Sequence, residues 1–153
     1  MNMKDLFSKL LPKRAVLPAT LTATPTAISI DLQGYKSCLL LIDVGAGGIT
    51  FNGTNNITFE LQDSPDGTTW TDVDITKVVG LTDAALTGGV IKSFTAAKAA
   101  ATLNAIGYTG GQRYIQLLAN FNGTHSTGTF VGAYAILGDA AFQRVEAPVA
   151  VAN

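Results

Sequence analysis

Two residues of this chain could act as a nucleophile and its base, Cys38 and His125, and each is the only residue of its type. Such a pair needs an exposed thiolate within hydrogen-bonding reach of the imidazole. Cys38 lies in the apolar run 38–42, which predicts a small buried side chain, whereas His125 lies in a polar loop, which predicts a solvated ring. The sequence therefore indicates no nucleophilic enzyme, and one histidine with one cysteine is too few for a protein zinc site.

Four aspartates gather around one predicted turn and could offer oxygen ligands to calcium. They are Asp63, Asp66, Asp72 and Asp74. Their spacing does not match a calcium-binding loop, and Asp-Gly turns form without a metal. Glu60 could pair with Asp63, but an alternating strand places Glu60 on its polar, solvated face, where nothing apolar raises the pKa of a carboxyl. We therefore expect no catalytic residue, no metal and no cofactor.

The 153-residue chain is long enough for one domain with a substantial core. Its net charge of −1 gives no basis for binding nucleic acid. No segment approaches the ~18 apolar residues of a membrane span, and residues 1–14 lack the continuous apolar stretch of a signal peptide. The charge is unevenly placed, because residues 1–14 carry four basic residues against one aspartate.

Residues 1–14 are predicted to form a short amphipathic helix that ends at Pro12. A helix of this length is marginal alone, so it either docks on a partner or remains a disordered tail. Residues 15–25 are predicted to be an extended linker. The candidate partner-contact residues are the apolar and basic side chains of this arm: Leu6, Phe7, Leu10, Leu11, Lys4, Lys9, Lys13 and Arg14.

The clearest strand signal runs from 57 to 63, where apolar and polar residues alternate strictly. The Ser-Pro-Asp-Gly sequence at 64–67 predicts a chain reversal, and residues 68–75 predict the second strand of a hairpin. That strand holds the only tryptophan, Trp70, which we expect in the core. Because Trp70 and Val73 cannot both point inward from a regular strand, we expect a bulge near 71–72 or a turn position for Trp70.

Further short strands are predicted at 28–32, 35–44, 113–121 and 129–137. The run 38–42 is apolar on both faces, which predicts a central strand covered on both sides. One short helix is predicted at 95–101. The prediction is an all-β fold, an antiparallel β-sandwich of jelly-roll type over 26–140, with the arm and linker 1–25 before it and a tail 141–153 after it. The predicted core side chains are Phe59, Leu61, Trp70, Leu40, Ile42, Ile115, Leu117 and Val131.

Several segments, in order and spacing, resemble a family of small tailed-phage virion proteins found beside the major capsid protein. The longest, Glu-Leu-Gln-Asp-Ser-Pro-Asp-Gly-Thr-Thr-Trp-Thr-Asp-Val, covers residues 60–73. Its Asp-Gly turn before Trp70 also occurs in discoidin-like carbohydrate modules. The arm 1–25 and the insert 95–101 depart from the family pattern, so their roles do not carry over. The other matching segments are 30–35, 41–45, 106–115 and 123–138.

The resemblance implies a structural virion protein and not an enzyme. It implies a capsid decoration, or cement, protein that binds the outer capsid surface and stabilises the shell by mass action. Its partners would be the major capsid protein and further copies of itself, with a trimer favoured, and neither nucleic acid nor a membrane. Two alternatives remain open: a head–tail connector or minor tail protein, and a carbohydrate-binding module for host attachment with Trp70 as an exposed platform.

Overall fold

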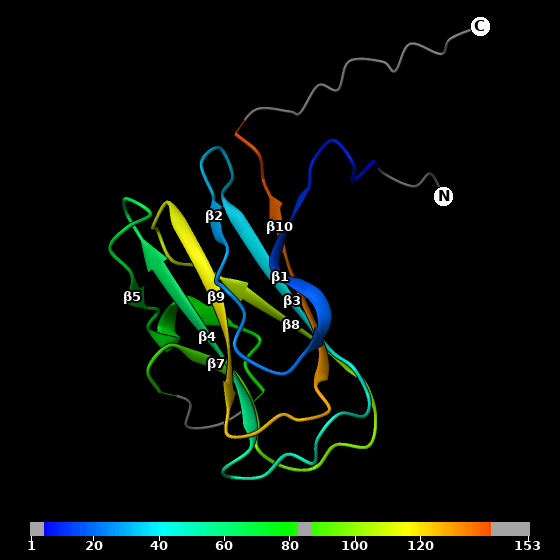
Figure 1. Cartoon of the computed structure of the whole chain (residues 1–153). Helices are drawn as coiled ribbons and strands as arrows, with labels where there is room; N and C mark the ends of the chain where they lie inside the picture. Colours follow the sequence, from blue (N-terminus) through cyan, green and yellow to red (C-terminus); the bar gives the residue numbers. More distant parts are fainter. Residues whose placement is uncertain (1–4, 83–86, 142–153) are drawn as a thin grey trace, which may run out of the picture.

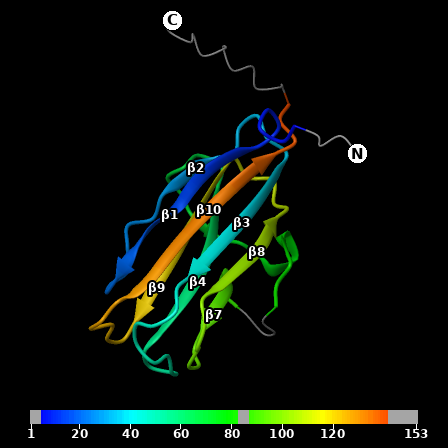
Figure 2. The ribbon, with the colours of Figure 1, turned by 90° about the vertical axis from the view of Figure 1, so that its right-hand side faces the viewer.

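A computed structural model describes residues 5–82 and 87–141. Over these residues the chain forms two antiparallel β-sheets packed face to face, which confirms the predicted β-sandwich (Figure 1). The described part contains no α-helix, and its one helical element is the 3₁₀ turn η1 (Ile75–Lys77). Figure 2 shows the sheet that contains β3 from its outer side.

The first sheet, called the β3 sheet below, has the strand order β1–β10–β3–β8–β6. Every neighbouring pair in it is antiparallel. The long strands β10 and β3 form its centre, and β1 and β6 are its edges. The bounds are β1 (Leu11–Leu21), β10 (Thr129–Gly138), β3 (Ser37–Val44), β8 (Thr102–Tyr108) and β6 (Val78–Val79).

The second sheet, called the β4 sheet below, has the order β2–β9–β4–β5. The outer edge of β4 is shared, since β7 pairs with its first half and β5 with its second half. A register shift separates Phe59 from Glu60 on this edge. The bounds are β2 (Ser29–Asp31), β9 (Tyr114–Asn122), β4 (Asn56–Ser64), β5 (Thr71–Asp72) and β7 (Val90–Phe94).

The core fills the space between the sheets with the inward side chains of their central strands. Alternation along β4 and β9 gives each strand one apolar and one polar face, as the sequence predicts. Phe59 is completely buried, and its ring meets the edge of the Phe94 ring at 6.1 Å between centroids. The other predicted core side chains apart from Trp70 are also buried: Leu61, Leu40, Ile42, Ile115, Leu117 and Val131.

Trp70 is half-buried and lies outside the core, so the prediction for this residue is wrong. The chain makes a loop over 65–70 before strand pairing resumes at β5. The Asp66 carboxylate holds this loop by accepting the backbone N–H groups of Thr68 and Thr69 at 2.9 and 2.8 Å. Trp70 therefore belongs to the loop, and Val73 is the side chain of this hairpin arm that is buried.

The N-terminal segment is a strand where the sequence predicts a helix and a linker. Residues 5–10 make a single turn, in which the Leu10 N–H donates to the Leu6 carbonyl at 3.1 Å, and β1 then pairs with β10. One turn is too short to be stable as a helix, whereas β10 offers a long row of backbone partners. Pro12 and Pro18 fit this strand because it lies at the edge of its sheet.

The helix predicted at 95–101 is also wrong, since these residues form a loop. The alanines of this segment favour a helix, but hydrogen bonds from Lys98 to the end of β3 stabilise the loop conformation. The Lys98 Nζ donates to the carbonyls of Val44 and Gly45 at 3.1 and 2.7 Å. The predicted tail from 142 onward and the candidate contact residue Lys4 lie outside the described residues.

Candidate functional site

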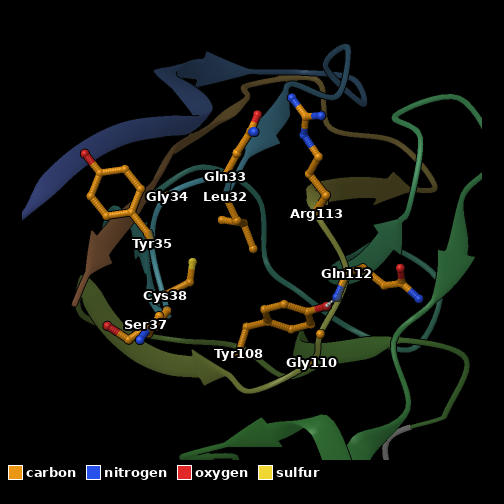
Figure 3. Close-up of a pocket in the computed structure, with 12 residues that line it drawn as sticks. Leu32, Gln33, Gly34, Tyr35, Ser37, Cys38, Tyr108, Gly110, Gln112 and Arg113 are labelled. Carbon is orange, nitrogen blue, oxygen red and sulfur yellow. Dashed lines mark hydrogen bonds between the residues drawn. The ribbon is translucent and has the colours of Figure 1, made fainter. Parts of the chain in front are cut away.

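The loops that join β2 to β3 and β8 to β9 border an open cleft of about 530 Å³ at one end of the sandwich. Figure 3 shows Cys38 and Tyr108 in its lining, with Tyr35, Gln112 and Arg113 around them. The Arg113 guanidinium is already paired, because it donates to both oxygens of Asp31 at 3.1 and 2.8 Å. The cleft therefore offers amide and phenol groups, with the exposed Lys36 as a further cationic side chain in its lining.

Cys38 is buried, as predicted, and its burial raises the pKa of the thiol to about 12. The thiol is therefore neutral at pH 7 and is a poor nucleophile. Cys38 pairs with Leu137 near the end of β10, whereas His125 precedes the start of that ten-residue strand. The two residues thus lie at opposite ends of the sandwich and cannot form a catalytic pair.

His125 is not the solvated loop histidine that the sequence predicts, because its side chain is buried and the residue is only 3% exposed. The loop folds back so that Nε2 lies 2.9 Å from the Asn122 carbonyl oxygen. A carbonyl oxygen only accepts, which assigns the proton to Nε2. The ring also meets the Phe121 ring edge-on, with 4.8 Å between centroids. These contacts give His125 a packing role in the β9–β10 loop.

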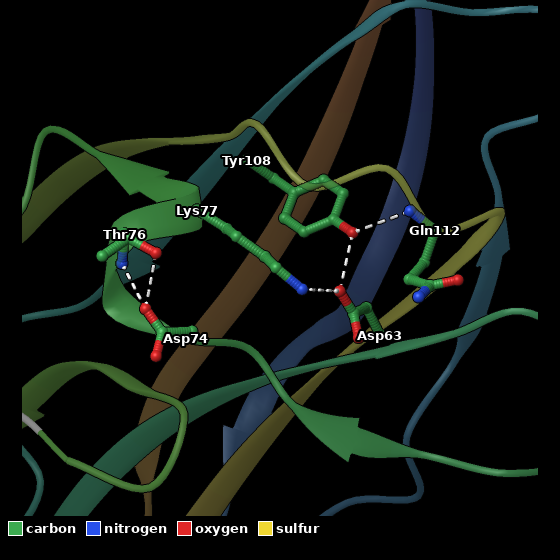
Figure 4. A network of polar contacts seen from close by, with 6 residues as sticks. All are labelled: Asp63, Asp74, Thr76, Lys77, Tyr108 and Gln112. Carbon is green, nitrogen blue, oxygen red and sulfur yellow. Dashed lines mark hydrogen bonds and ion pairs between the residues drawn. The ribbon is translucent and has the colours of Figure 1, made fainter.

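A buried carboxylate joins the two sheets beside the cleft. Asp63 on β4 accepts the Tyr108 hydroxyl of β8 at 2.8 Å, and the Lys77 ammonium lies 3.8 Å from the same oxygen (Figure 4). The backbone N–H of Gln112 donates to the Tyr108 oxygen at 3.3 Å. Burial and the hydrogen bond to Asp63 raise the pKa of Tyr108, so the phenol stays protonated and remains a donor. The sequence did not predict this contact, which depends on the packing of one sheet on the other.

The aspartates near the predicted turn do not converge on one point. Asp66 holds its own loop, and Asp74 caps η1 by accepting the Thr76 N–H at 2.8 Å. Within residues 5–82 and 87–141 no group of three or more His, Cys, Asp or Glu side chains could hold a metal ion. The same ranges contain no helix with the length and apolarity to cross a membrane.

The structure pairs Glu60 with Asp72, and not with Asp63. The Gln62 amide donates to Glu60 Oε1 at 3.0 Å and to Asp72 Oδ1 at 2.9 Å. Partial burial, followed by the hydrogen bond and the charge of Asp72, raises the pKa of Glu60. The prediction of an unperturbed carboxyl on a solvated face is therefore wrong for Glu60. Local sequence patterns do not predict this pair, because the pairing of β5 with β4 brings the two residues together.

Glu60→Gln is expected to stabilise the protein at pH 7 and to leave its stability unchanged at about pH 3. A folded-state pKa above the unfolded value means that ionisation favours unfolding, whereas well below the unfolded pKa of about 4.3 both states hold the proton. Urea unfolding at the two pH values measures the difference.

Asp31→Asn is the control of opposite sign for this experiment. The hydrogen bond from Arg113 is the main cause of the lowered pKa of Asp31, so its carboxylate stabilises the folded state above the unfolded pKa. We expect this variant to lose stability at pH 7. An equal loss for Glu60→Gln at pH 7 would contradict the carboxylate-pair interpretation.

The outer surface of the β3 sheet is apolar, although the sequence predicts that β3 is covered on both sides. Leu39 is 40% exposed and Leu103 is 68% exposed. The β4 sheet covers only the inner face of β3, so the prediction that this strand is covered on both sides is wrong for its outer face. We call this surface the outer β3 face, and it comprises Pro12, Arg14, Pro18, Leu39, Leu41, Asp43, Val79, Leu103, Ala105, Phe130, Tyr134 and Ile136.

The predicted partner-contact residues are divided by the structure. Leu6 and Phe7 protrude from the N-terminal turn and are 62% and 63% exposed, whereas Leu10 and Leu11 are half-buried. These four side chains line an apolar hollow of about 510 Å³ together with Pro12 and Ile136. Two of the basic residues, Lys13 and Arg14, belong to β1, and Lys9 is exposed in the turn.

The fold and these surfaces define an antiparallel β-sandwich with an apolar outer face. No family model, curated protein or solved structure matches the chain.

Proposed function

We propose that the protein is a structural component of a tailed-phage virion and decorates the outer surface of the capsid. The sequence segments that resemble the virion family support this proposal. They fall on the strands and turns of the sandwich: residues 60–73 run from β4 to β5, and residues 106–115 run from β8 to β9. The buried, neutral thiol of Cys38 supports a binding role over a nucleophilic one.

The observation that carries the proposal is the exposed pair Leu6 and Phe7 on a short hydrogen-bonded turn. The Asp5 carboxylate accepts the Phe7 N–H at 2.8 Å and the Ser8 hydroxyl at 2.5 Å, which holds the turn at the start of β1. Burying apolar area gains roughly 25 cal/mol per Å², so a held apolar pair gains free energy by docking on another protein. The exposed Lys9 beside it can meet carboxylates at the rim of such a contact.

The capsid protein is the partner that the resemblance favours. A ligand that binds the assembled shell, and not its dissociated subunits, stabilises the shell by mass action. No covalent chemistry is needed for this activity, which suits a chain in which Asp66 holds a turn, Asp74 caps η1 and Asp63 joins two strands.

Leu6→Ser/Phe7→Ser is expected to weaken binding to capsid shells by about tenfold to a hundredfold. Two apolar anchors each carry on the order of 1 kcal/mol or more of binding energy. Sedimentation of the full chain with shells of the major capsid protein encoded beside it measures the affinity. Ile75→Ser is the matched control, because Ile75 is also an exposed apolar side chain but lies on η1.

The full chain should co-sediment with the shells and raise their melting temperature. Absence of co-sedimentation would contradict capsid decoration. Equal weakening by Ile75→Ser would show that loss of any exposed apolar side chain has the effect, and would remove the N-terminal turn as the contact.

Carbohydrate binding for host attachment is the second candidate, since Trp70 is partly exposed on the loop after the Asp66-Gly67 turn. A tryptophan face in that position can stack on a sugar ring. Loss of glycan binding in Trp70→Ala, in a protein that stays folded and loses only about 1 kcal/mol of stability, would favour this candidate over decoration.

A further inference from the structure

Residues of the outer β3 face form rows that run across the strands, and most residues in these rows are apolar. The register places Ile136, Leu39 and Gly107 in one row and Tyr134, Leu41 and Ala105 in the next. Pro12 extends the first row on β1, and Val79 extends it on β6. Most side chains in these two rows are apolar, which matches the interior of a sheet-on-sheet contact better than a solvated surface.

At two glycines of this face, Gly107 and Gly132, side chains of neighbouring strands cover the backbone. A Cβ added at Gly107 would lie 2.6 Å from Val79 Cγ2, and one at Gly132 would lie 3.0 Å from Pro18 Cβ. Neighbouring side chains therefore fill the space above both glycines. The face is therefore filled at these two positions, whereas near Leu10 two open hollows of about 510 and 470 Å³ reach Ile136 and Leu39. A broad, open apolar surface of this kind suits another sheet better than a small ligand.

We propose that the outer β3 face packs against the same face of a second copy of this chain. Two sheets with the same twist pack face to face at about 30°, so a second copy supplies a surface of matching curvature. A two-fold axis that runs along the strands, between β10 and β3, places β3 of the second copy over β10 of the first. Leu41 and Leu39 of the second copy then lie opposite Tyr134 and Ile136 of the first copy. This arrangement is self-complementary, as a two-fold contact requires.

The charges of the face also favour a second copy. Arg14 projects from β1 beside Tyr134, and Asp43 projects from β3 beside Gly132. In this arrangement, Asp43 of the second copy lies opposite Gly132 of the first copy, whereas Arg14 of the first copy lies beside Tyr134. The two positions are therefore one strand and two residues apart, about 8 Å along the surface, and an arginine side chain spans this distance. Lys98, the charged neighbour of Asp43, already donates to two backbone carbonyls. Each copy thus presents one acid and one base to the other.

Association along the edge of the β3 sheet is less favourable than association through its face. The edge strand β1 carries Pro12 and Pro18, which cannot donate to a further strand. Register shifts on either side of Val16 also break the straight row of backbone groups. Of these two contacts, the face is therefore more favourable for a second copy than the β1 edge.

Leu39→Lys tests this inference by placing a charge at the centre of the face. Sedimentation velocity of the full chain across a concentration series should show a dimer, and Leu39→Lys should be monomeric with an unchanged circular dichroism spectrum. Leu118→Lys is the matched control and should remain dimeric, because Leu118 lies between buried residues on β9 and faces outward from the β4 sheet.

A charge exchange provides a second test that does not depend on the apolar substitution. Arg14→Glu and Asp43→Arg should each weaken the dimer about tenfold, and the double variant should restore most of that loss. A monomeric full chain, a trimer, or a Leu39→Lys variant that still dimerises would overturn the inference.

These outcomes are independent of capsid decoration. A monomer that binds shells would remove the face-to-face dimer and leave the proposed function. A dimer that binds no shells would do the reverse.

Discussion

Phe59→Ala is expected to lower the free energy of unfolding by about 3–5 kcal/mol, because it leaves a cavity between the sheets. Phe59 has no exposed surface, and its ring packs edge-on against Phe94. Trp70→Ala should cost about 1 kcal/mol, since a half-buried side chain gives up about half the transfer free energy of a buried one. Urea unfolding of the two variants measures both values.

The order of these two effects is the informative result, because it reverses the prediction from sequence that placed Trp70 in the core. Ile57→Val is a mild control on the same strand and should cost about 1 kcal/mol. A larger loss for Trp70→Ala than for Phe59→Ala would contradict the position of Trp70 in the loop.

Deleting residues 1–21 is expected to abolish folding or to lower the free energy of unfolding by about 5 kcal/mol or more. The deletion removes β1, withdraws the buried Ala15 and Val16 from the core and leaves β10 without its outer partner. A loss of that size is comparable to the whole stability of a small domain. Circular dichroism and urea unfolding would detect it.

Deleting residues 1–8 is the matched control for this truncation. It removes most of the N-terminal turn, including the exposed Leu6 and Phe7, and keeps all of β1. This shorter deletion should unfold at nearly the same urea concentration as the full chain. If the 1–21 deletion unfolds like the full chain as well, β1 contributes little to the sandwich and its assignment as a core strand is wrong.

The sequence predicted the strands whose pattern reflects burial on one side. Alternation over β4 and β9 identified Phe59, Leu61, Ile115 and Leu117 as inward residues, because a period of two fixes the face. The same reasoning failed at Trp70, since it assumed that pairing resumes directly after the Asp66-Gly67 turn. Hydrogen bonds from the loop backbone to Asp66 lengthen that turn, and side-chain periodicity carries no signal of them.

The N-terminal strand was missed for a different reason. Leu6, Phe7, Leu10 and Leu11 have helical spacing, but tertiary pairing with β10 overrides this local preference. The Glu60–Asp72 and Asp63–Tyr108 contacts depend on which strands pair and pack, so local patterns do not predict them. His125 belongs to the same class, because its burial follows from how the β9–β10 loop folds back on Phe121.

The two-sided apolar pattern of β3 predicted cover on both faces, and within this chain the prediction holds for the inner face and is wrong for the outer face. Its inner side chains, Leu40 and Ile42, are buried between the sheets. Its outer side chains, Leu39 and Leu41, belong to the face for which a second copy is inferred. The apolar pattern therefore predicted the inner face of β3 correctly, whereas cover of the outer face belongs to the proposal of a second copy.

Copy number in the purified virion tests the central claim, capsid decoration, most directly. The proposal expects a phage to encode this chain, and quantitative mass spectrometry of that phage's particles would compare the amount of this protein with that of the major capsid protein. A decoration protein occupies sites repeated by the symmetry of the shell, so we predict on the order of hundreds of copies per particle. About a dozen copies or fewer would indicate a connector or tail protein, and complete absence from the particle would contradict a virion role.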